Sequence, residues 1–400
     1  MFVDNFENQS TGIKSDSLKK QWLETATQFL KGKPYQDLEW EFSEGIFVEP
    51  YYTKDDSKNE ESTSDLSYLQ ILQNNQLALN EPVSQPRFWY NQPFVVVNNL
   101  EKEELEKANK EIRQVLMSGA EGVLLDLRSL KSDSLSNFDK KSFEYLLFEV
   151  ALPYCAVSFQ IDVKKEDQLQ NFSKSYIDYA KEKGFDTNLL NGGLLCGNLS
   201  SKKIENVGLI SNSETTFRSI SLQLQNTKDE AQAIAEILFE VKNLVDKSNK
   251  SILQNIQFVV EATDSFFVTI TKIRVLRWLL IQMYDLYEVD SKPYIHSMTS
   301  QGRDEKSLQD ENWNLIRNTT QAFSCILGGT NALTVVSHQD ENSERSKIWA
   351  NRIARNVSVM LREESFIDAT ADPISGSYYC EQMTDKLIAS AWEKFQKMIV

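Results

Sequence analysis

The strongest constraint on the fold is an alternation of short apolar runs with longer amphipathic stretches, which begins near residue 90 and continues to the end of the chain. Runs such as FVVVN (94–98) and VLLDL (123–127) have the apolar character of strands that are buried on both faces. The stretches between the runs, such as 101–117 and 229–246, place apolar residues at helical spacing. Strands that alternate with helices in this way form βαβ units and a parallel sheet.

The same order recurs along the remainder of the chain, although residues 185–215 indicate neither element clearly. About seven or eight βα units favour a closed barrel over an open sheet. We therefore predict an α/β protein with a (β/α)8 TIM-type barrel over residues 86–400. The further strands are expected at 154–161, 218–225, 258–262, 293–299 and 332–336, and the further helices at 165–183, 264–285, 312–326, 346–362 and 382–399.

Residues 1–85 depart from this pattern and are predicted to form an N-terminal arm and linker. A helix is expected at 16–32, followed by an irregular segment that carries Trp40 and the pair Tyr51–Tyr52. The stretch 53–67 is polar and buries too little apolar surface to offset the entropy of ordering, so we expect a loop or mobile linker there. The aromatic side chains of the arm need a surface to cover, either on this chain's own barrel or on a partner chain.

Composition and charge argue against several classes of protein. The chain carries a net charge of −15 and a pI near 4.8, so nucleic acid and anionic membrane surfaces would repel it. The longest apolar stretch, 266–284, contains Lys272, Arg274 and Arg277 and is too charged to span a membrane. The N-terminal sequence lacks the features of a signal peptide. We expect a cytoplasmic protein without a disulfide framework or a zinc site, in which the four separated cysteines stay reduced: Cys155, Cys196, Cys325 and Cys380.

Four segments in the second half of the chain carry motifs that are specific enough to compare with known families. The first, SFFVTITKIRVLRWL (265–279), has a Phe-Phe start and Lys-x-Arg-x-x-Arg spacing, and the second is IHSMTSQ (295–301). The third is NLIRNTTQAFSCILGGTNAL (314–333), and the fourth (351–392) combines R-I-A-R-N, E-E-S and D-P-x-x-G-S-Y-Y-x-E. All four resemble motifs of the methylmalonyl-CoA mutases, and the arm around Trp40 is similar to the arms of the small subunits of that family.

The resemblance implies an activity and a cofactor. Members of the family interconvert methylmalonyl-CoA and succinyl-CoA by radical rearrangement, using adenosylcobalamin and a barrel through which the CoA chain threads. Catalytic chains hold cobalt with a histidine in a D-x-H-x-x-G motif, on a domain C-terminal to the barrel. Tyr294 stands two residues before His296, Val336 stands two before His338, and the 400 residues end at Val400, after the last predicted helix. We therefore expect no C-terminal cobalamin-binding domain.

At the positions where, by the resemblance, catalytic members of the family bind or act on the substrate, this chain carries other residues. The Tyr-His at the end of the strand that matches 218–225 is replaced by Gln225–Asn226, whose amides cannot act as acids. The glutamine of the family's H-S-Q-T-S strand end is Met298, and no arginine that could grip a substrate carboxylate stands at 187–202. The resemblance thus implies no catalytic, cofactor-binding or metal-binding residue. Asn226, His296 and Met298 remain candidates for a relic pocket, while His296 is alternatively satisfied by a neighbouring backbone group.

Asp372 and Pro373, followed by Gly376, are typical of a structural turn, since Asp bonds nearby backbone amides and Pro fixes φ.

Three functions remain open. The preferred one is a non-catalytic small subunit of an adenosylcobalamin-dependent methylmalonyl-CoA mutase, in a heterodimer with a large catalytic subunit around which the arm wraps. The second is an acyl-CoA mutase that works with a separate cobalamin-binding chain. The third is a regulatory module that binds acyl-CoA in a vestigial barrel.

Overall fold

In the computed structural model of the protein, the described residues are 15–53, 56, 88–130, 135, 138–162, 166–196, 215–300, 311–338 and 344–399. The predicted linker 53–67 lies outside them, apart from Thr53 and Asp56.

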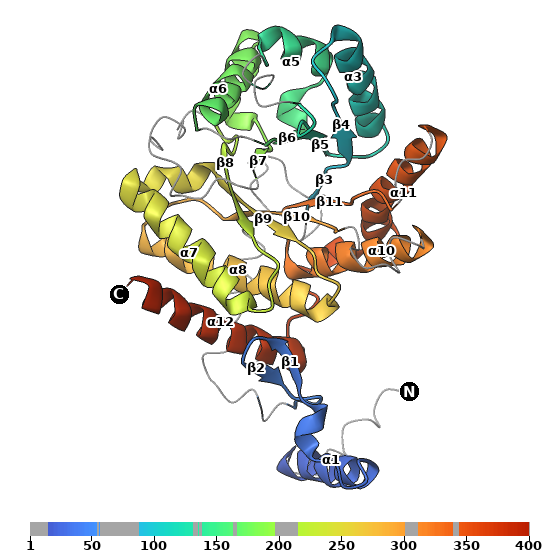
Figure 1. Cartoon of the computed structure of the whole chain (residues 1–400), viewed down its shortest axis with the longest axis vertical. Coiled ribbons are helices and arrows are strands. Elements are labelled where there is room, and N and C mark those ends of the chain that lie inside the picture. The colour runs from blue at the N-terminus through green and yellow to red at the C-terminus, as the bar shows by residue number, and fades with distance from the viewer. Residues whose placement is uncertain are drawn as a thin grey trace, which may run out of the picture.

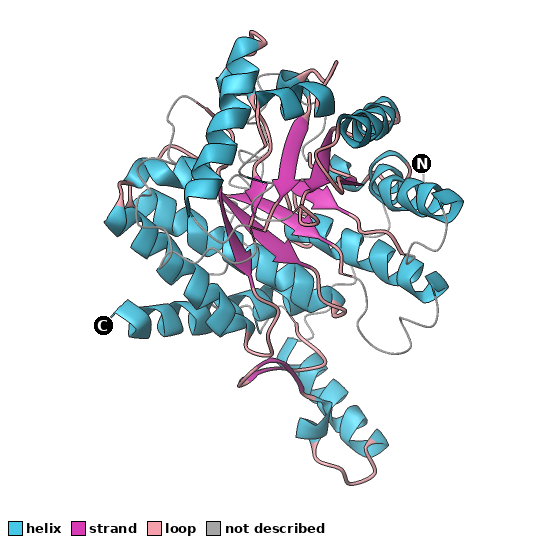
Figure 2. Cartoon of the chain, turned by 45° about the horizontal axis from the view of Figure 1, so that its top comes forward, coloured by secondary structure: helices cyan, strands magenta, loops and turns pink. Residues whose placement is uncertain are grey.

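Parallel strands form the centre of the molecule, and Figure 2 shows them gathered inside a surround of helices. Two runs of strands are hydrogen-bonded in register, in the orders β4-β5-β6-β7 and β8-β9-β10-β11-β3. Every pairing within these two runs is parallel. The strands are β3 (Tyr90–Asn91), β4 (Phe94–Val96), β5 (Gly122–Asp126), β6 (Ala156–Gln160), β7 (Leu194–Leu195), β8 (Ile220–Leu224), β9 (Ile256–Glu261), β10 (Tyr294–Met298) and β11 (Ala332–Thr334).

Backbone hydrogen bonds at two seams join these runs into a closed ring. At the first seam, β3 and β4 belong to one extended segment: Gln92 N donates to Leu333 O at 2.9 Å, and Leu124 N donates to Pro93 O at 2.9 Å. At the second seam, Gly193 and Arg218 form a parallel bridge, and Leu194 N donates to Arg218 O at 2.8 Å. With β3 and β4 counted as one strand, the ring has eight parallel members, which confirms the predicted barrel.

Helices follow the strands and cover the outside of the ring (Figure 1). Side-chain caps mark the start of several of them: Asp229 accepts from Gln232 N at the start of α7, and Asp139 accepts from Ser142 N at the start of α5. None of the described helices combines the length and the apolar character that crossing a membrane requires. The helices of the barrel are α3 (Lys102–Met117), α5 (Lys140–Leu146), α6 (Glu166–Glu182), α7 (Glu230–Lys247), α8 (Phe266–Leu286), α10 (Glu311–Gly328), α11 (Glu344–Glu363) and α12 (Tyr378–Ile399).

The N-terminal segment begins with α1 (Ser15–Phe29) and a short 3-10 helix, η1 (Tyr35–Leu38), and ends in a hairpin that the sequence did not predict. Strands β1 (Trp40–Ser43) and β2 (Ile46–Val48) are antiparallel, and Gly45 makes their turn with a φ of +74°. Figure 1 places the hairpin against α12, with α1 projecting beyond it.

The hairpin docks on the barrel through both apolar and polar contacts. Phe42, Ile46 and Val48 are buried in the main core. Ser43 Oγ accepts from Glu230 N at 3.1 Å, at the first turn of α7. Lys386 Nζ of α12 donates to Tyr52 OH at 3.1 Å. The chain's own barrel is therefore one surface that the aromatic residues of the arm cover.

Candidate functional site

The side chains that point into the barrel form an apolar cluster at each end of its axis. Residues that pair in register between parallel strands share a face, so one set of alternate positions on every strand lines the axis. The cluster at the N-terminal ends of the strands contains Tyr90, Ala156, Tyr294 and Ala332, with Phe88 against it. The cluster towards the C-terminal ends, which we call the upper apolar cluster, contains Leu124, Leu195 and Val259, with Phe94 and Met298 against it.

Polar side chains lie between the two apolar clusters. Gln92, Ser158, His296 and Thr334 occupy inward positions there and are almost completely buried. His296 Nε2 lies 2.8 Å from Thr334 Oγ1, which donates to Gln92 O at 2.8 Å. The histidine is thus held by a hydroxyl group that is itself tied to the backbone, rather than by a backbone group directly.

Burial decides the protonation state of His296. Desolvation lowers the pKa of the imidazole to about 3, so the ring is neutral near pH 7. Its Nδ1 atom has no hydrogen-bond partner within the described residues. In this environment the imidazole can neither supply a proton at neutral pH nor reach a solute outside the barrel.

The three candidates for the relic pocket lie at different places. His296 and Met298 share one face of β10, with Met298 in the upper apolar cluster. Asn226 lies beyond the end of β8 and is exposed, and its Oδ1 accepts a hydrogen bond from Lys272 Nζ of α8. In the part of the chain that the structure describes, no hydrogen bond links Asn226 to His296 or Met298.

The partner of Asn226 is a buried amine that the sequence did not single out. Lys272 is 0% exposed, and burial lowers the pKa of its ammonium group, while the nearby Glu230 carboxylate opposes that shift. Glu230 is itself buried, which raises its pKa. The sequence signal was limited to the first position of the Lys-x-Arg-x-x-Arg motif in a mostly apolar helix.

The two histidines of the chain do not fit the role of a cobalt ligand for adenosylcobalamin. Both are buried, His296 at 0% and His338 at 4% exposed, so neither imidazole is presented at the protein surface. The ring of His338 also lies edge-on to Trp349, 5.4 Å between centroids. Within the described residues, no cluster of three or more His, Cys, Asp or Glu side chains could hold a metal ion.

The two arginines of the Lys-x-Arg-x-x-Arg motif of α8 connect segments that lie far apart in the sequence. Arg274 is 1% exposed and forms ion pairs with Asp372 and, at 3.4 Å, with Glu381. Asp372 also accepts from Ile374 N at 3.1 Å, which confirms the predicted turn. Two motifs that are far apart in the sequence are therefore bound to each other inside the protein.

The second arginine of the motif, Arg277, binds the connections on either side of β10. It donates to Pro293 O at 3.1 Å, to Gly329 O and to Asn331 Oδ1 at 2.7 Å. Asn331 Oδ1 also accepts from Ile295 N at 2.9 Å. This guanidinium positions the start of β10 and the turn that leads into β11.

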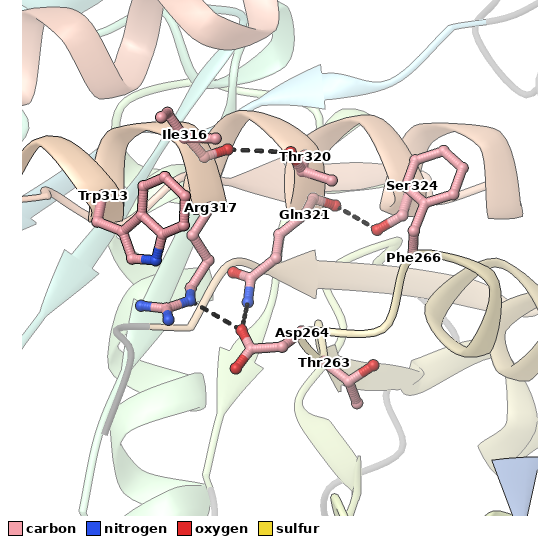
Figure 3. Close-up of a pocket in the computed structure, with 9 residues that line it drawn as sticks. All are labelled: Thr263, Asp264, Phe266, Trp313, Ile316, Arg317, Thr320, Gln321 and Ser324. Carbon is pink, nitrogen blue, oxygen red and sulfur yellow. Dashed lines mark hydrogen bonds and ion pairs between the residues drawn. The ribbon is translucent and has the colours of Figure 1, made fainter. Parts of the chain in front are cut away.

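A pocket of about 230 Å³ opens between the end of β9 and the helices α8 and α10 (Figure 3). Asp264 Oδ1 accepts from Arg317 Nε at 2.9 Å and from Gln321 Nε2 at 3.1 Å, and Figure 3 shows these groups facing one another. Because the carboxylate is balanced by Arg317, the pocket presents no unbalanced charge. Its lining residues are Thr263, Asp264, Phe266, Trp313, Ile316, Arg317, Thr320, Gln321 and Ser324.

Comparison with known proteins places the chain beside methylmalonyl-CoA mutases. The family model described as methylmalonyl-CoA mutase matches residues 225–399. The methylmalonyl-CoA mutase small subunit of Porphyromonas gingivalis is 26% identical over 94% of this chain and 62% of its own length. The small subunit of Propionibacterium freudenreichii subsp. shermanii is 31% identical over 36% of this chain and 23% of its own length.

Other similarities are weaker. The mitochondrial methylmalonyl-CoA mutase of Macaca fascicularis is 24% identical over 94% of this chain and 54% of its own length. A 7,8-dihydropteroate synthase structure from Vibrio fischeri ES114 covers 72% of this chain and 98% of its own, with a TM-score of 0.38 and 11% identity, and is too distant to bear on the fold. The chain thus spans about three fifths or less of the length of these curated relatives.

The matched region holds α8 together with the segments that Arg274 and Arg277 bind to it: α12 and the turn before it, the start of β10 and the turn before β11. The small subunit from Porphyromonas gingivalis extends the similarity to almost the whole chain. This chain is therefore similar to the methylmalonyl-CoA mutase family, over residues 225–399 by the family model and over almost its whole length by one small subunit.

Proposed function

We propose that this chain is the non-catalytic small subunit of an adenosylcobalamin-dependent methylmalonyl-CoA mutase, located in the cytoplasm and paired with a large catalytic subunit. In that complex the large subunit converts methylmalonyl-CoA to succinyl-CoA, and adenosylcobalamin bound there supplies the radical. Relatives that carry the name small subunit support the assignment. The observation that carries it is the filled axis of the barrel.

An acyl-CoA chain that threads a barrel needs open space along the axis. Here that space is occupied by the upper apolar cluster, in which Leu124 is 0%, Leu195 3% and Val259 6% exposed. Emptying even one leucine-sized position in a packed core costs about 2–5 kcal/mol. A substrate would need to displace several such side chains, which opposes both an active mutase and an acyl-CoA-binding module.

The position of Asn226 also weighs against an active mutase. A group that steers a thioester radical must lie beside the substrate, whereas Asn226 is exposed at the rim and bonded to Lys272. The neutral, buried His296 does not replace it. We therefore assign the chemistry to the large subunit and a supporting role to this chain.

The N-terminal arm offers a surface for the large subunit. Three aromatic side chains of the arm remain in solvent: Phe29 at the end of α1 is 81% exposed, and Trp40 and Phe47 of the hairpin are 39% and 47% exposed. Exposed apolar groups that gather on a projecting element mark contacts with other proteins. We propose that they pack against the large subunit.

Co-purification tests this pairing. The chain is co-expressed with a tagged large subunit from the same organism, and the mass of the complex is measured by light scattering after size exclusion. We expect one copy of each chain, and Trp40→Asp together with Phe47→Asp should weaken the complex at least tenfold. Met117→Asp is a matched control, because Met117 is 86% exposed on α3 at the far end of the molecule from the arm (Figure 1).

Two results would count against the proposal. One is a chain that stays monomeric in the presence of the large subunit. The other is a titration calorimetry signal from succinyl-CoA with this chain alone, since binding along the axis is incompatible with the packed apolar cluster.

A further inference from the structure

A charged side chain at the N-terminal end of the barrel has no counter-ion among the described residues. Arg218 comes just before β8, and its guanidinium carbon lies 3.6 Å from the centre of the Tyr294 ring, at the first residue of β10. Its one described hydrogen bond runs from Nη1 to Gly192 O and is long, at 3.5 Å. Across the described ranges, no carboxylate lies within ion-pair distance of it. A partly buried cation without a counter-ion is costly, and proteins normally pair such groups.

Two phenol groups lie in the same cluster. Tyr294 is 6% and Tyr90 9% exposed, and both belong to the apolar cluster at this end of the axis. The Tyr294 hydroxyl is buried and has no hydrogen-bond partner within the described residues. Most buried hydroxyl groups are hydrogen-bonded, so this one is an available donor beside a cation.

The phenols cannot themselves neutralise Arg218. Burial raises the pKa of Tyr294 to about 12 and that of Tyr90 further above its usual range, so both groups keep their protons near neutral pH. The neighbouring amide of Gln257 donates through Nε2 to Leu194 O at 2.7 Å, and its Oε1 is a neutral acceptor. The Glu121 carboxylate, which acts on Tyr90, is paired with Arg362, so the cluster presents one positive charge and hydroxyl donors without an unpaired negative charge.

We propose that Arg218, Tyr294 and Tyr90 form a binding site for a small monovalent anion of the chloride class, which seals the N-terminal end of the barrel. One guanidinium balances one negative charge, which favours a monovalent ion. Phe88, Ala156 and Ala332 pack around the same cluster, and the cation that lies over Phe88, Arg362, is already paired with Glu121, which disfavours a multiply charged anion. This site is independent of the mutase assignment, because it concerns the stability of the barrel alone.

Thermal unfolding in chloride tests the proposal. The melting temperature is measured at constant ionic strength while sodium chloride replaces sodium gluconate. An ion that binds only the folded state raises the melting temperature with the logarithm of its concentration once the site is saturated. We expect this rise in the unmodified protein and in Arg113→Met, which removes an exposed guanidinium from α3, and its loss in Arg218→Met.

A second measurement keeps the test decisive if Arg218→Met does not fold. Crystals of the unmodified protein grown in sodium bromide are measured at the bromine absorption edge. An anomalous peak within hydrogen-bond distance of the Arg218 guanidinium and the Tyr294 hydroxyl is the expected result, and Tyr294→Phe should weaken it. No peak at Arg218, or an equal chloride response in Arg218→Met and the unmodified protein, overturns the proposal. Electron density for phosphate at Arg218 in phosphate-grown crystals, with no bromide peak in bromide-grown ones, likewise overturns it, because the ligand would then not be of the chloride class.

Discussion

The outer shell and the axis of the barrel differ in whether their buried polar groups have partners. In the shell, the charges of α8 are matched: Arg274 meets Asp372 and Glu381, and Arg277 meets backbone carbonyls and Asn331. Along the axis, both amide atoms of Gln92, the hydroxyl of Ser158 and Nδ1 of His296 are buried without a partner in the described residues.

This difference separates the part of the sequence that maintains the fold from the part where a substrate would bind. The motifs by which the chain resembles the methylmalonyl-CoA mutases include structural ones, because they bind α8 to the turn before α12 and to the start of β10. The axis retains polar side chains but closes over them with apolar ones. The shell therefore keeps the motifs of the resemblance around an axis that is filled by side chains.

The largest expected effect comes from the shell. Arg274→Met leaves Asp372 and Glu381 as buried carboxylates without their cation, and we expect a loss of about 3–5 kcal/mol in the free energy of unfolding measured by urea titration. The matched control is Arg113→Met, whose pair with Glu149 is exposed and contributes about 0–1 kcal/mol. Equal losses in the two variants would mean that the shell does not depend on its buried charges.

The next effect tests the packing of the axis. Leu124→Ala removes a fully buried side chain from the upper apolar cluster, and we expect a loss of about 3 kcal/mol in the free energy of unfolding. Met117→Ala, at a position that is 86% exposed, should change it by about 0.5 kcal/mol or less. A Leu124→Ala protein as stable as the parent would indicate a loosely filled axis.

The pH dependence of stability probes the polar part of the axis. The pKa of His296 is about 3 in the folded protein and returns to its ordinary value near 6.5 on unfolding, so the unfolded chain binds the extra proton between these values. Stability therefore falls as the pH drops below 6.5, by about 1.4 kcal/mol per pH unit from this group. His296→Gln should remove that slope from the variant, so the stability difference between the two proteins should change with pH in urea titrations at pH 7, 6 and 5. Parallel stability curves for the two proteins would show that His296 is accessible to protons in the folded state.

The smallest effect concerns the joint between the arm and the barrel. Ser43→Ala removes the acceptor for Glu230 N at the start of α7, and we expect a loss of about 1 kcal/mol in the free energy of unfolding. Ser118→Ala serves as control, because that hydroxyl is exposed and bonds within its own helix end. Should both variants match the parent protein, the hairpin would contribute nothing to the stability of α7.

The sequence predicted the repeating elements well because their signal is local. VLLDL at 123–127 becomes the fully buried β5, and the periodic stretch at 229–246 becomes α7 at Glu230–Lys247. The seven-residue α5 and the hairpin of β1 and β2 were missed, since short elements have few apolar positions from which to read a period. Strand β7 is only two residues long, which explains why residues 185–215 gave no clear indication.

The candidate site was harder to predict because its contacts are long-range. The sequence named His296 and Met298 as candidates, and their shared face of β10 became visible only in the structure. The sequence could not indicate that Asn226 would bond to Lys272, or that Arg218 would stack on Tyr294, because no local motif connects residues so far apart in the sequence. Such pairs arise only when the ring of strands closes.

The most direct test of the central claim is an assay for succinyl-CoA formed from methylmalonyl-CoA with adenosylcobalamin, comparing this chain alone, a large subunit alone and the two together. The account predicts no product from this chain at any cofactor concentration, and turnover whenever the large subunit is present. Turnover by this chain alone, abolished by Asn226→Ala, would contradict it.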